Sequence, residues 1–247
     1  MLEPPAAATL APCRSVLLAG AGGGYDVLGA VPLLVQLRAA GKNVHLASLT
    51  FSDLEALSPL EREHTAPNLA AVRGEAAVAG LYCPEAWLAG WLASNLDYRQ
   101  PVWLLDKTGV EPMRVAYELL VEKLSVDAIV LVDGGIDVLL RGDETSLGTP
   151  GEDLTSLCAV STVHCPVKLV ACLGMGAELR DGIHHSQFLE RVSQLSQIGG
   201  FLGTSSLSLL SEAGRAYESA VDYIFSNQRG LRQSHVHRAV LAAMRAL

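Results

Sequence analysis

An acidic segment from Leu131 to Asp153, LVDGGIDVLLRGDETSLGTPGED, stands out in a chain of which only 18% is charged. It directly follows DAIVLVD (127–133), an apolar run that predicts a strand buried on both faces. The apolar flanks of Asp133 and Asp137 indicate that these two side chains are not freely solvated. A buried carboxylate must be paired, hydrogen-bonded, protonated or bound to a metal ion, so chemistry is predicted at the end of this strand.

Carboxylates gathered at one strand end suit three kinds of chemistry. They bind a hard cation such as Mg²⁺, they act as general acids and bases when crowding raises a pKa, and they accept hydrogen bonds from sugar hydroxyls. We expect Asp133 and Asp137 to be catalytic groups and ligands of a divalent cation. We expect Arg141 to orient the acids or contact an anionic group, and Asp143 and Glu144 to contact the ligand. A solvated loop or cap position is the alternative for Asp143, Glu144, Glu152 and Asp153.

A glycine-rich loop, GAGGGYD (20–26), is the second candidate. It joins the apolar run SVLLAG (15–20) to a helical segment, as loops that bind phosphate do. Tyr25 occupies the third glycine position of G-x-G-x-x-G and no acid ends the next strand, which disfavours a dinucleotide cofactor. We expect Asp26 to share the catalytic work of the acidic segment, although a capped tight turn without a ligand is the alternative. The residues of this loop expected to bind ligand are Gly22, Gly23 and Gly24.

Segments that follow other predicted strands supply further candidates. Asp106 ends PVWLLD (101–106) and is expected to bind the ligand, and Glu178 and Asp181 follow PVKLVACLG (166–174). Ligands of open α/β sheets bind outside the carboxyl ends of the strands. All these residues are therefore expected at one rim of the sheet.

The elements that would position these residues alternate between strands and helices. A strand at 15–20, a helix at 25–41 that Pro32 should kink or break, and a strand at 43–49 form one unit, which predicts parallel pairing. The amphipathic helix 111–125 is expected to bury Val115, together with Leu119, Leu120 and Leu124. Other strands are expected at 101–106, 127–133 and 166–174, and other helices at 84–95, 152–164, 184–197, 208–225 and 232–247.

This order predicts an α/β fold, a three-layer Rossmann-like sandwich around a mostly parallel sheet. We expect a flexible N-terminal tail, residues 1–14, and a single domain over residues 15–247, with residues 51–95 as a small insertion.

The composition narrows the class of protein. The net charge is −8, which disfavours nucleic acid and an anionic membrane surface as partners. Half of the residues are hydrophobic, but no apolar stretch reaches the roughly 18 residues of a membrane helix. A surface shared in a homo-oligomer would explain the low charge, and a chain merely rich in alanine and leucine is the alternative. Five cysteines without a CxxC pair predict reduced thiols and a cytoplasmic location.

Three motifs together, GGGYDV, VLVDGGIDVLLRGDE and LGTPGED, resemble a family of prokaryotic proteins known only as a domain of unknown function. The resemblance covers most of the chain, from about Val16 to the C-terminus. It implies positions of interest and no reaction. Those positions are Gly22, Gly23, Gly24, Asp26, Asp133, Gly135, Asp137, Arg141, Gly142, Asp143, Glu144, Pro150, Glu152 and Asp153.

The sequence thus favours an enzyme that acts on a small polar metabolite, sugar-like, nucleotide or phosphorylated, by hydrolase or lyase chemistry with assistance from a divalent metal. Two alternatives stay open at this point. The same loops would hold a small molecule or nucleotide without catalysis, or the acidic segment would lie at the interface of a structural homo-oligomer.

Overall fold

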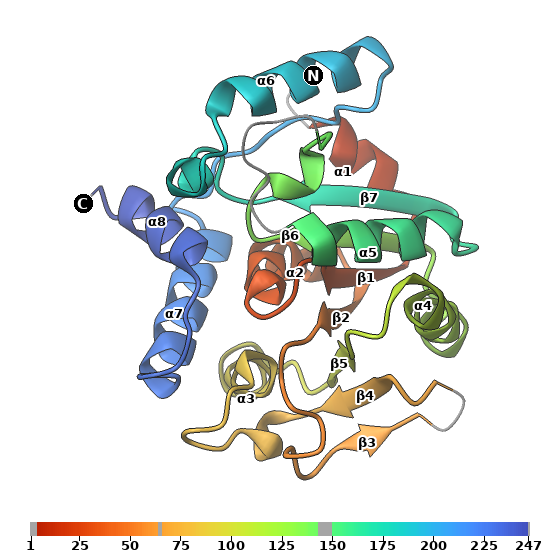
Figure 1. The fold of residues 1–247 in the computed structure, drawn as a ribbon, viewed down its shortest axis with the longest axis vertical. Helices are drawn as coiled ribbons and strands as arrows, with labels where there is room; N and C mark the ends of the chain where they lie inside the picture. The colour runs from red at the N-terminus through yellow and green to blue at the C-terminus, as the bar shows by residue number, and fades with distance from the viewer. Residues whose placement is uncertain (1–3, 64–65, 143–149, 247) are drawn as a thin grey trace.

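The computed structural model describes residues 4–63, 66–142 and 150–246 of the chain. Its centre is a single sheet of seven strands in the order β3-β4-β5-β2-β1-β6-β7 (Figure 1). The last five of these pair in parallel, whereas β3 and β4 form an antiparallel edge. The strands are β1 (Ser15–Gly20), β2 (Asn43–Leu49), β3 (Glu61–Arg62), β4 (Leu69–Val72), β5 (Val102–Leu105), β6 (Ala128–Asp133) and β7 (Val167–Cys172).

Helices cover both faces of the sheet, which gives the three-layer, Rossmann-like sandwich that the sequence predicts. Side chains that alternate along β1 divide between two hydrophobic cores: Val16 and Leu18 belong to one core, and Leu17 to the other. The first core is covered by α2 (Val31–Ala39), α3 (Pro84–Leu96), α7 (Glu212–Asn227) and α8 (His235–Met244). The second core is covered by α4 (Val110–Leu124) and α5 (Pro150–Thr162), on the opposite side of the sheet in Figure 1.

The connection after β1 differs in detail from the single helix expected over 25–41. A short 3-10 helix, η1 (Asp26–Ala30), comes first, and α2 then begins at Val31. Pro32 lies in the first turn of α2, where its missing N–H has no partner to lose. The proline therefore marks the start of a helix, and Asp26 sits at the first position of η1, directly after the glycine loop.

Two sequence expectations about burial are wrong. Val115 of α4 is 38% exposed, because Met113, Ala116, Tyr117 and Leu120 form the buried stripe around the large Tyr117 side chain. The segment 166–174 was expected as a buried strand, but Val170 of β7 is 40% exposed. Within the residues that the structure describes, β7 pairs with β6 alone and forms the edge of the sheet, so part of its surface is left open.

Residues 51–95, expected to form an insertion, contribute β3, β4 and α3 to the common sheet and its covering layer (Figure 1). The expected N-terminal tail contains α1 (Pro5–Leu10), whose Leu10 is buried.

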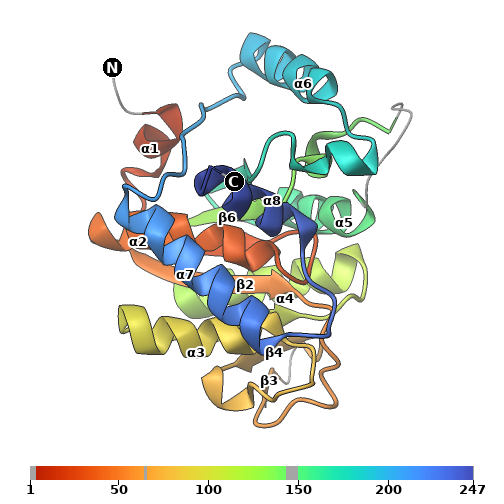
Figure 2. The ribbon, with the colours of Figure 1, turned by 90° about the vertical axis from the view of Figure 1, so that its left-hand side faces the viewer.

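At the other end of the sheet, α6 (His185–Gln197) lies beyond β7 (Figure 1) and has no buried residue. Figure 2 shows α6 set apart from α5 and α8. Ile198 and Leu210, in the segment that follows α6, are 80% and 92% exposed. The homo-oligomer stays a prediction. In the described part of the chain, no helix is both long and apolar enough to span a membrane.

Helices α7 and α8 hold the glycine loop through a buried hydrogen-bond chain. The Tyr217 hydroxyl lies 2.6 Å from Nδ1 of His237, and His237 Nε2 lies 2.9 Å from the carbonyl oxygen of Tyr25. Burial lowers the pKa of His237 to about 4, so the ring is neutral and carries one proton. Only Nε2–H can donate to a carbonyl, which makes Nδ1 the acceptor of the tyrosine proton. This chain fixes the main chain directly before Asp26.

We expect His237→Ala to destabilise the fold by about 3 kcal/mol, because it leaves a cavity and removes the partner of both Tyr217 and the Tyr25 carbonyl. Urea unfolding followed by circular dichroism measures the change. His164→Ala is the matched control, since His164 is exposed, and it should alter the unfolding free energy by less than about 0.5 kcal/mol. Equal stability of the two variants would contradict a role of the buried chain in holding the loop.

Candidate metal centre

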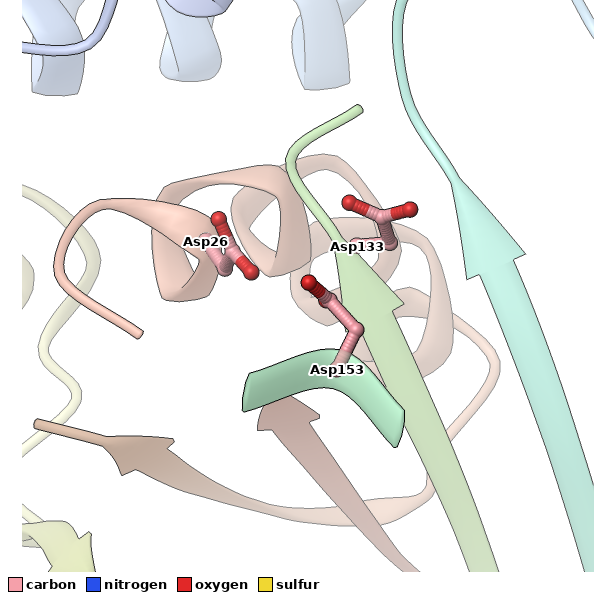
Figure 3. Close-up of side chains that lie close together, drawn as sticks. All are labelled: Asp26, Asp133 and Asp153. Atoms are coloured by element: carbon pink, nitrogen blue, oxygen red, sulfur yellow. The ribbon is translucent and has the colours of Figure 1, made fainter. Parts of the chain in front are cut away.

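Three aspartates from distant parts of the chain meet at the carboxyl ends of β1 and β6. One carboxylate oxygen from each of Asp26, Asp133 and Asp153 lies within 4.8 Å of the corresponding oxygens of the other two. Figure 3 shows the three side chains converging from three separate elements. Two of these residues, Asp26 and Asp133, were predicted as site residues from the sequence, and the structure brings them together at the expected rim of the sheet.

Each aspartate is positioned by a different local feature. Asp133 is the last residue of β6, and its Oδ2 accepts a hydrogen bond from the Val138 N–H at 3.2 Å. Asp26 opens η1, and its Oδ2 accepts the Gly22 N–H at 2.6 Å, so the glycine loop folds back onto its own carboxylate. Asp153 lies in the first turn of α5, where the partial positive charge of the helix N-terminus favours an acid.

Burying these three carboxylates costs free energy unless a further group binds to them. Asp133 and Asp153 are only 2% and 3% exposed, whereas Asp26 is partly exposed. The Oδ1 atom of Asp153 is buried and has no hydrogen-bond partner. An unsatisfied buried acceptor is rare in native proteins because it loses its hydration and gains nothing in return. The orphaned oxygen therefore points to a ligand of the cluster.

Two more acidic side chains, Asp137 and Glu178, lie beside the three-aspartate cluster. Asp137 is 3% exposed and Glu178 is 6% exposed, and Glu178 accepts the N–H of Ile136. Among the residues whose side chains the structure describes, Asp26, Asp133 and Asp153 form no salt bridge with a lysine or arginine. Their own protons or a bound cation can neutralise these three carboxylates.

The raised pKa values of the three aspartates show that ionising them together in this buried position is unfavourable. Burial, followed by repulsion from Asp137 and Glu178, raises the pKa of Asp26 to about 7, although hydrogen bonds from the Gly22 and Gly134 amides oppose the rise. Burial and then the charges of Asp26 and Asp137 raise the pKa of Asp153 to about 9. Burial and then the charges of Asp26 and Asp153 raise the pKa of Asp133 well above its ordinary value. Without a cation, the cluster keeps protons near neutral pH.

The donor set fits a hard divalent cation. Oxygens that bind one ion at about 2.1–2.5 Å lie at most about 4–5 Å apart, and the three oxygens meet this limit. Carboxylates are the ligands that Mg²⁺, Mn²⁺ and Ca²⁺ prefer. A bare ion is smaller than a water molecule, so it can occupy a space from which solvent is excluded. The cation ligands expected from the sequence were Asp133 and Asp137, whereas the carboxylate oxygens that lie within reach of one ion are those of Asp26, Asp133 and Asp153.

Glycine at position 22 leaves room for this site. A β-carbon added there would lie 2.6 Å from both carboxylate oxygens of Asp153 and 2.8 Å from Oδ2 of Asp26. No side chain fits at that distance, so the glycine loop can lie against the cluster only because residue 22 has none.

The other predicted ligand-binding residues lie outside the three-aspartate cluster. Gly23 and Gly24 contact Phe51, and Asp106 lines an open hollow beside Asn68 that also reaches Val115 of α4. Arg141 is half exposed, with its Nη1 3.7 Å from the Glu190 carboxylate of α6. Asp143 and Glu144 lie outside the described residues.

Two residues of the site, Asp153 and Glu178, were not among the catalytic, ligand-binding or metal-binding residues expected from the sequence. Asp153 was assigned a solvated cap as its alternative, but it shares the buried face of α5 with Ser156 and Val160, at spacings of three and seven residues. That spacing was the available signal. Glu178 follows β7 across a loop, and its contact with the main chain at Gly135 and Ile136 could not be read from the sequence.

The raised pKa values predict how stability depends on pH. The unfolded aspartates release their protons near pH 3.9, whereas the folded, metal-free protein retains them up to about pH 7 for Asp26 and about pH 9 for Asp153. The folded state binds more protons in this window, so stability should fall as pH rises from about 4 to 9.

We therefore expect the melting temperature in EDTA to drop between pH 5 and pH 9. Asp153→Asn, which is neutral without taking up a proton on folding, should raise it at pH 8 by about 5 °C. Differential scanning fluorimetry measures both, with the exposed Asp53→Asn as control. A melting temperature of the metal-free protein that rises over this range would contradict the assigned shifts.

The comparisons with known proteins bear on the family alone. Residues 86–226 match the family described as Protein of unknown function (DUF1152), a segment that includes Asp133 and Asp153 and lies C-terminal to Asp26. No curated protein and no solved structure matches the chain. The match spans more than half of the chain, so the chain belongs to the DUF1152 family of proteins of unknown function, as its resemblance to a family of unknown function predicts.

Proposed function

We propose that this protein is a metal-dependent enzyme that acts on a small polar metabolite, with Asp26, Asp133 and Asp153 as ligands of one divalent cation. The observation that carries the proposal is the orphaned Oδ1 of Asp153 inside a cluster of three carboxylates. A cation would satisfy this oxygen and offset the repulsion that raises all three pKa values.

The residues around the cluster suit hydrolase or lyase chemistry. A bound cation would polarise a substrate oxygen or lower the pKa of a bound water. Asp137 is buried beside the cluster, and its charge contributes to the raised pKa of each of the three aspartates. Once the cation neutralises those ligands, a carboxylate in this position can accept a proton from a water or a substrate hydroxyl. We assign Asp137 this role of general base.

The alternative proposal, a binding protein without catalysis, differs in one respect. It requires the same cation and ligand but no turnover. Asp137→Asn separates the two proposals. In an enzyme it should abolish turnover, whereas a binding protein should show no turnover with or without the substitution.

We expect isothermal titration with Mn²⁺ at pH 7.5 to show one site per chain. Asp133→Asn and Asp153→Asn should each weaken Mn²⁺ binding at least tenfold, because an amide oxygen carries no charge. The affinity should also rise with pH, since the cation displaces protons from the aspartates. Asp106→Asn is the control and should bind Mn²⁺ like the wild type, since Asp106 lies outside the three-aspartate cluster.

A pair of glycine variants tests the geometry of the same site. A methyl group at Gly22 would lie against the carboxylates of Asp153 and Asp26, whereas at Gly151, in the first turn of α5, it meets nothing within 4 Å. Gly22→Ala should therefore weaken Mn²⁺ binding and Gly151→Ala should not. Wild-type affinity in Gly22→Ala, Asp133→Asn and Asp153→Asn would overturn the proposed metal centre.

A further inference from the structure

The metal centre opens toward the glycine loop. Asp133 and Asp153 are buried, whereas Asp26 is partly exposed. Gly22, whose N–H donates a hydrogen bond to Asp26, is also partly exposed. A substrate therefore reaches the cluster from the side of Asp26 and Gly22. The residues next along that loop, Gly23 and Gly24, are buried and lie against Phe51.

An exposed aromatic ring lies beside this entrance. Phe51, two residues after β2, is 40% exposed, so part of its side chain is open to solvent. An added β-carbon at Gly23 would lie 3.0 Å from Cε1 and Cζ of Phe51, and one at Gly24 would lie 3.4 Å from its Cδ2. The ring therefore lies directly against the glycine loop and keeps a surface open for a ligand.

A cationic side chain lies at the same place. The Lys107 amino group, which follows β5, is 5.6 Å from the centre of the Phe51 ring and forms an ion pair with Glu152. Glu152 is the neighbour of Asp153 in α5, so Lys107 connects the ring to the edge of the metal centre. Its side chain is 57% exposed and can reach an incoming anion.

The glycine loop offers hydrogen-bond donors. Within the described residues, the main-chain N–H groups of Gly23, Gly24 and Tyr25 have no acceptor. Gly23 and Gly24 have φ angles of +92° and +63°, which release the loop from a regular hydrogen-bonding pattern. Successive free amides in such a turn favour an anion such as phosphate. Because the five carboxylates would repel that anion, it should bind only when the cation is present.

We propose that Phe51, Lys107 and the amides of Gly23 and Gly24 form a subsite for a nucleotide-class ligand, a phosphate joined to a planar ring. The phosphate would lie between the cation, the amides and Lys107, and the ring would stack on Phe51. This inference rests on the proposed metal centre and names its substrate class. Since α-carbons of adjacent residues are about 3.8 Å apart, the carboxylates at Gly22 and the ring at Gly23 are at most on the order of 10 Å apart. A nucleoside monophosphate spans a comparable length from its phosphate to its base.

Isothermal titration of the Mn²⁺-saturated protein with AMP and with ribose 5-phosphate separates the base from the sugar phosphate. AMP should bind roughly tenfold more tightly, since stacking on an aromatic side chain contributes about 1–3 kcal/mol per base. Phe51→Leu should remove this difference and leave Mn²⁺ affinity unchanged. Tyr223→Leu is the matched control, because Tyr223 is a similarly exposed aromatic residue on α7, against Trp87 of α3.

The lysine is tested by a second matched pair. Lys107→Met should weaken the binding of AMP and of ribose 5-phosphate alike. Lys123→Met should weaken neither, although Lys123 also pairs with a glutamate and lies 5.2 Å from the centre of an aromatic ring, at the far end of α4.

Three results of these titrations are decisive. Equal affinity for AMP and ribose 5-phosphate, or no binding of either, overturns the subsite, and the metal centre stands if Mn²⁺ still binds. AMP binding that needs Phe51 but no cation supports the aromatic part of the subsite and overturns the placement of the phosphate on the cation, whereas the metal centre is decided by the Mn²⁺ titration alone. Cation-dependent binding that Phe51→Leu and Lys107→Met weaken as described supports both.

Discussion

Electrostatic repulsion among buried carboxylates is the constraint on which this account of the structure depends. Asp26, Asp133 and Asp153 place oxygens within 4.8 Å of one another, and Asp133 and Asp153 have almost no contact with solvent. Like charges at that distance in a protein interior repel by several kcal/mol, and burial adds a desolvation cost to each charge. The cluster is therefore stable only when it holds protons or, as we propose, a divalent cation.

The fold makes this arrangement possible by bringing three chain segments to one edge. The parallel pairing of β1 with β6 places the glycine loop and Asp133 side by side, and α5 returns to add Asp153. The buried chain from Tyr217 through His237 to Tyr25 fixes the loop from the opposite side. A large hydrophobic core on both faces of the sheet provides the stability against which the unfavourable cluster is maintained, as is common for sites where function and stability conflict.

Much of this organisation could be predicted from the sequence because local patterns determine it. The runs that form β1, β2 and β6 are apolar and bounded by turn residues, and the rule that ligands bind at the carboxyl ends of parallel strands was sufficient to place Asp26 and Asp133 together. The predicted resemblance to a family of unknown function is confirmed by the match to residues 86–226. Strands β3 and β4 were missed because they have only two and four residues and lack alternation.

The features that could not be predicted from the sequence depend on contacts between residues far apart in the chain. The exposure of Val115 depends on which side of α4 faces the sheet, and the role of Glu178 depends on a loop that crosses to Gly135. His237, one of two histidines near the start of α8, resembles any surface histidine until α7 and the glycine loop are packed against it. Similarly, Phe51 gains its importance from Gly23 and Lys107, which approach it from β1 and β5.

Anomalous diffraction from crystals grown with Mn²⁺ tests the central claim most directly. The account predicts one strong peak bounded by Asp26, Asp133 and Asp153, with each carboxylate oxygen about 2.0–2.3 Å from the ion and Oδ1 of Asp153 among the ligands. A well-ordered cluster without a peak, at Mn²⁺ concentrations that saturate the protein in solution, would contradict it.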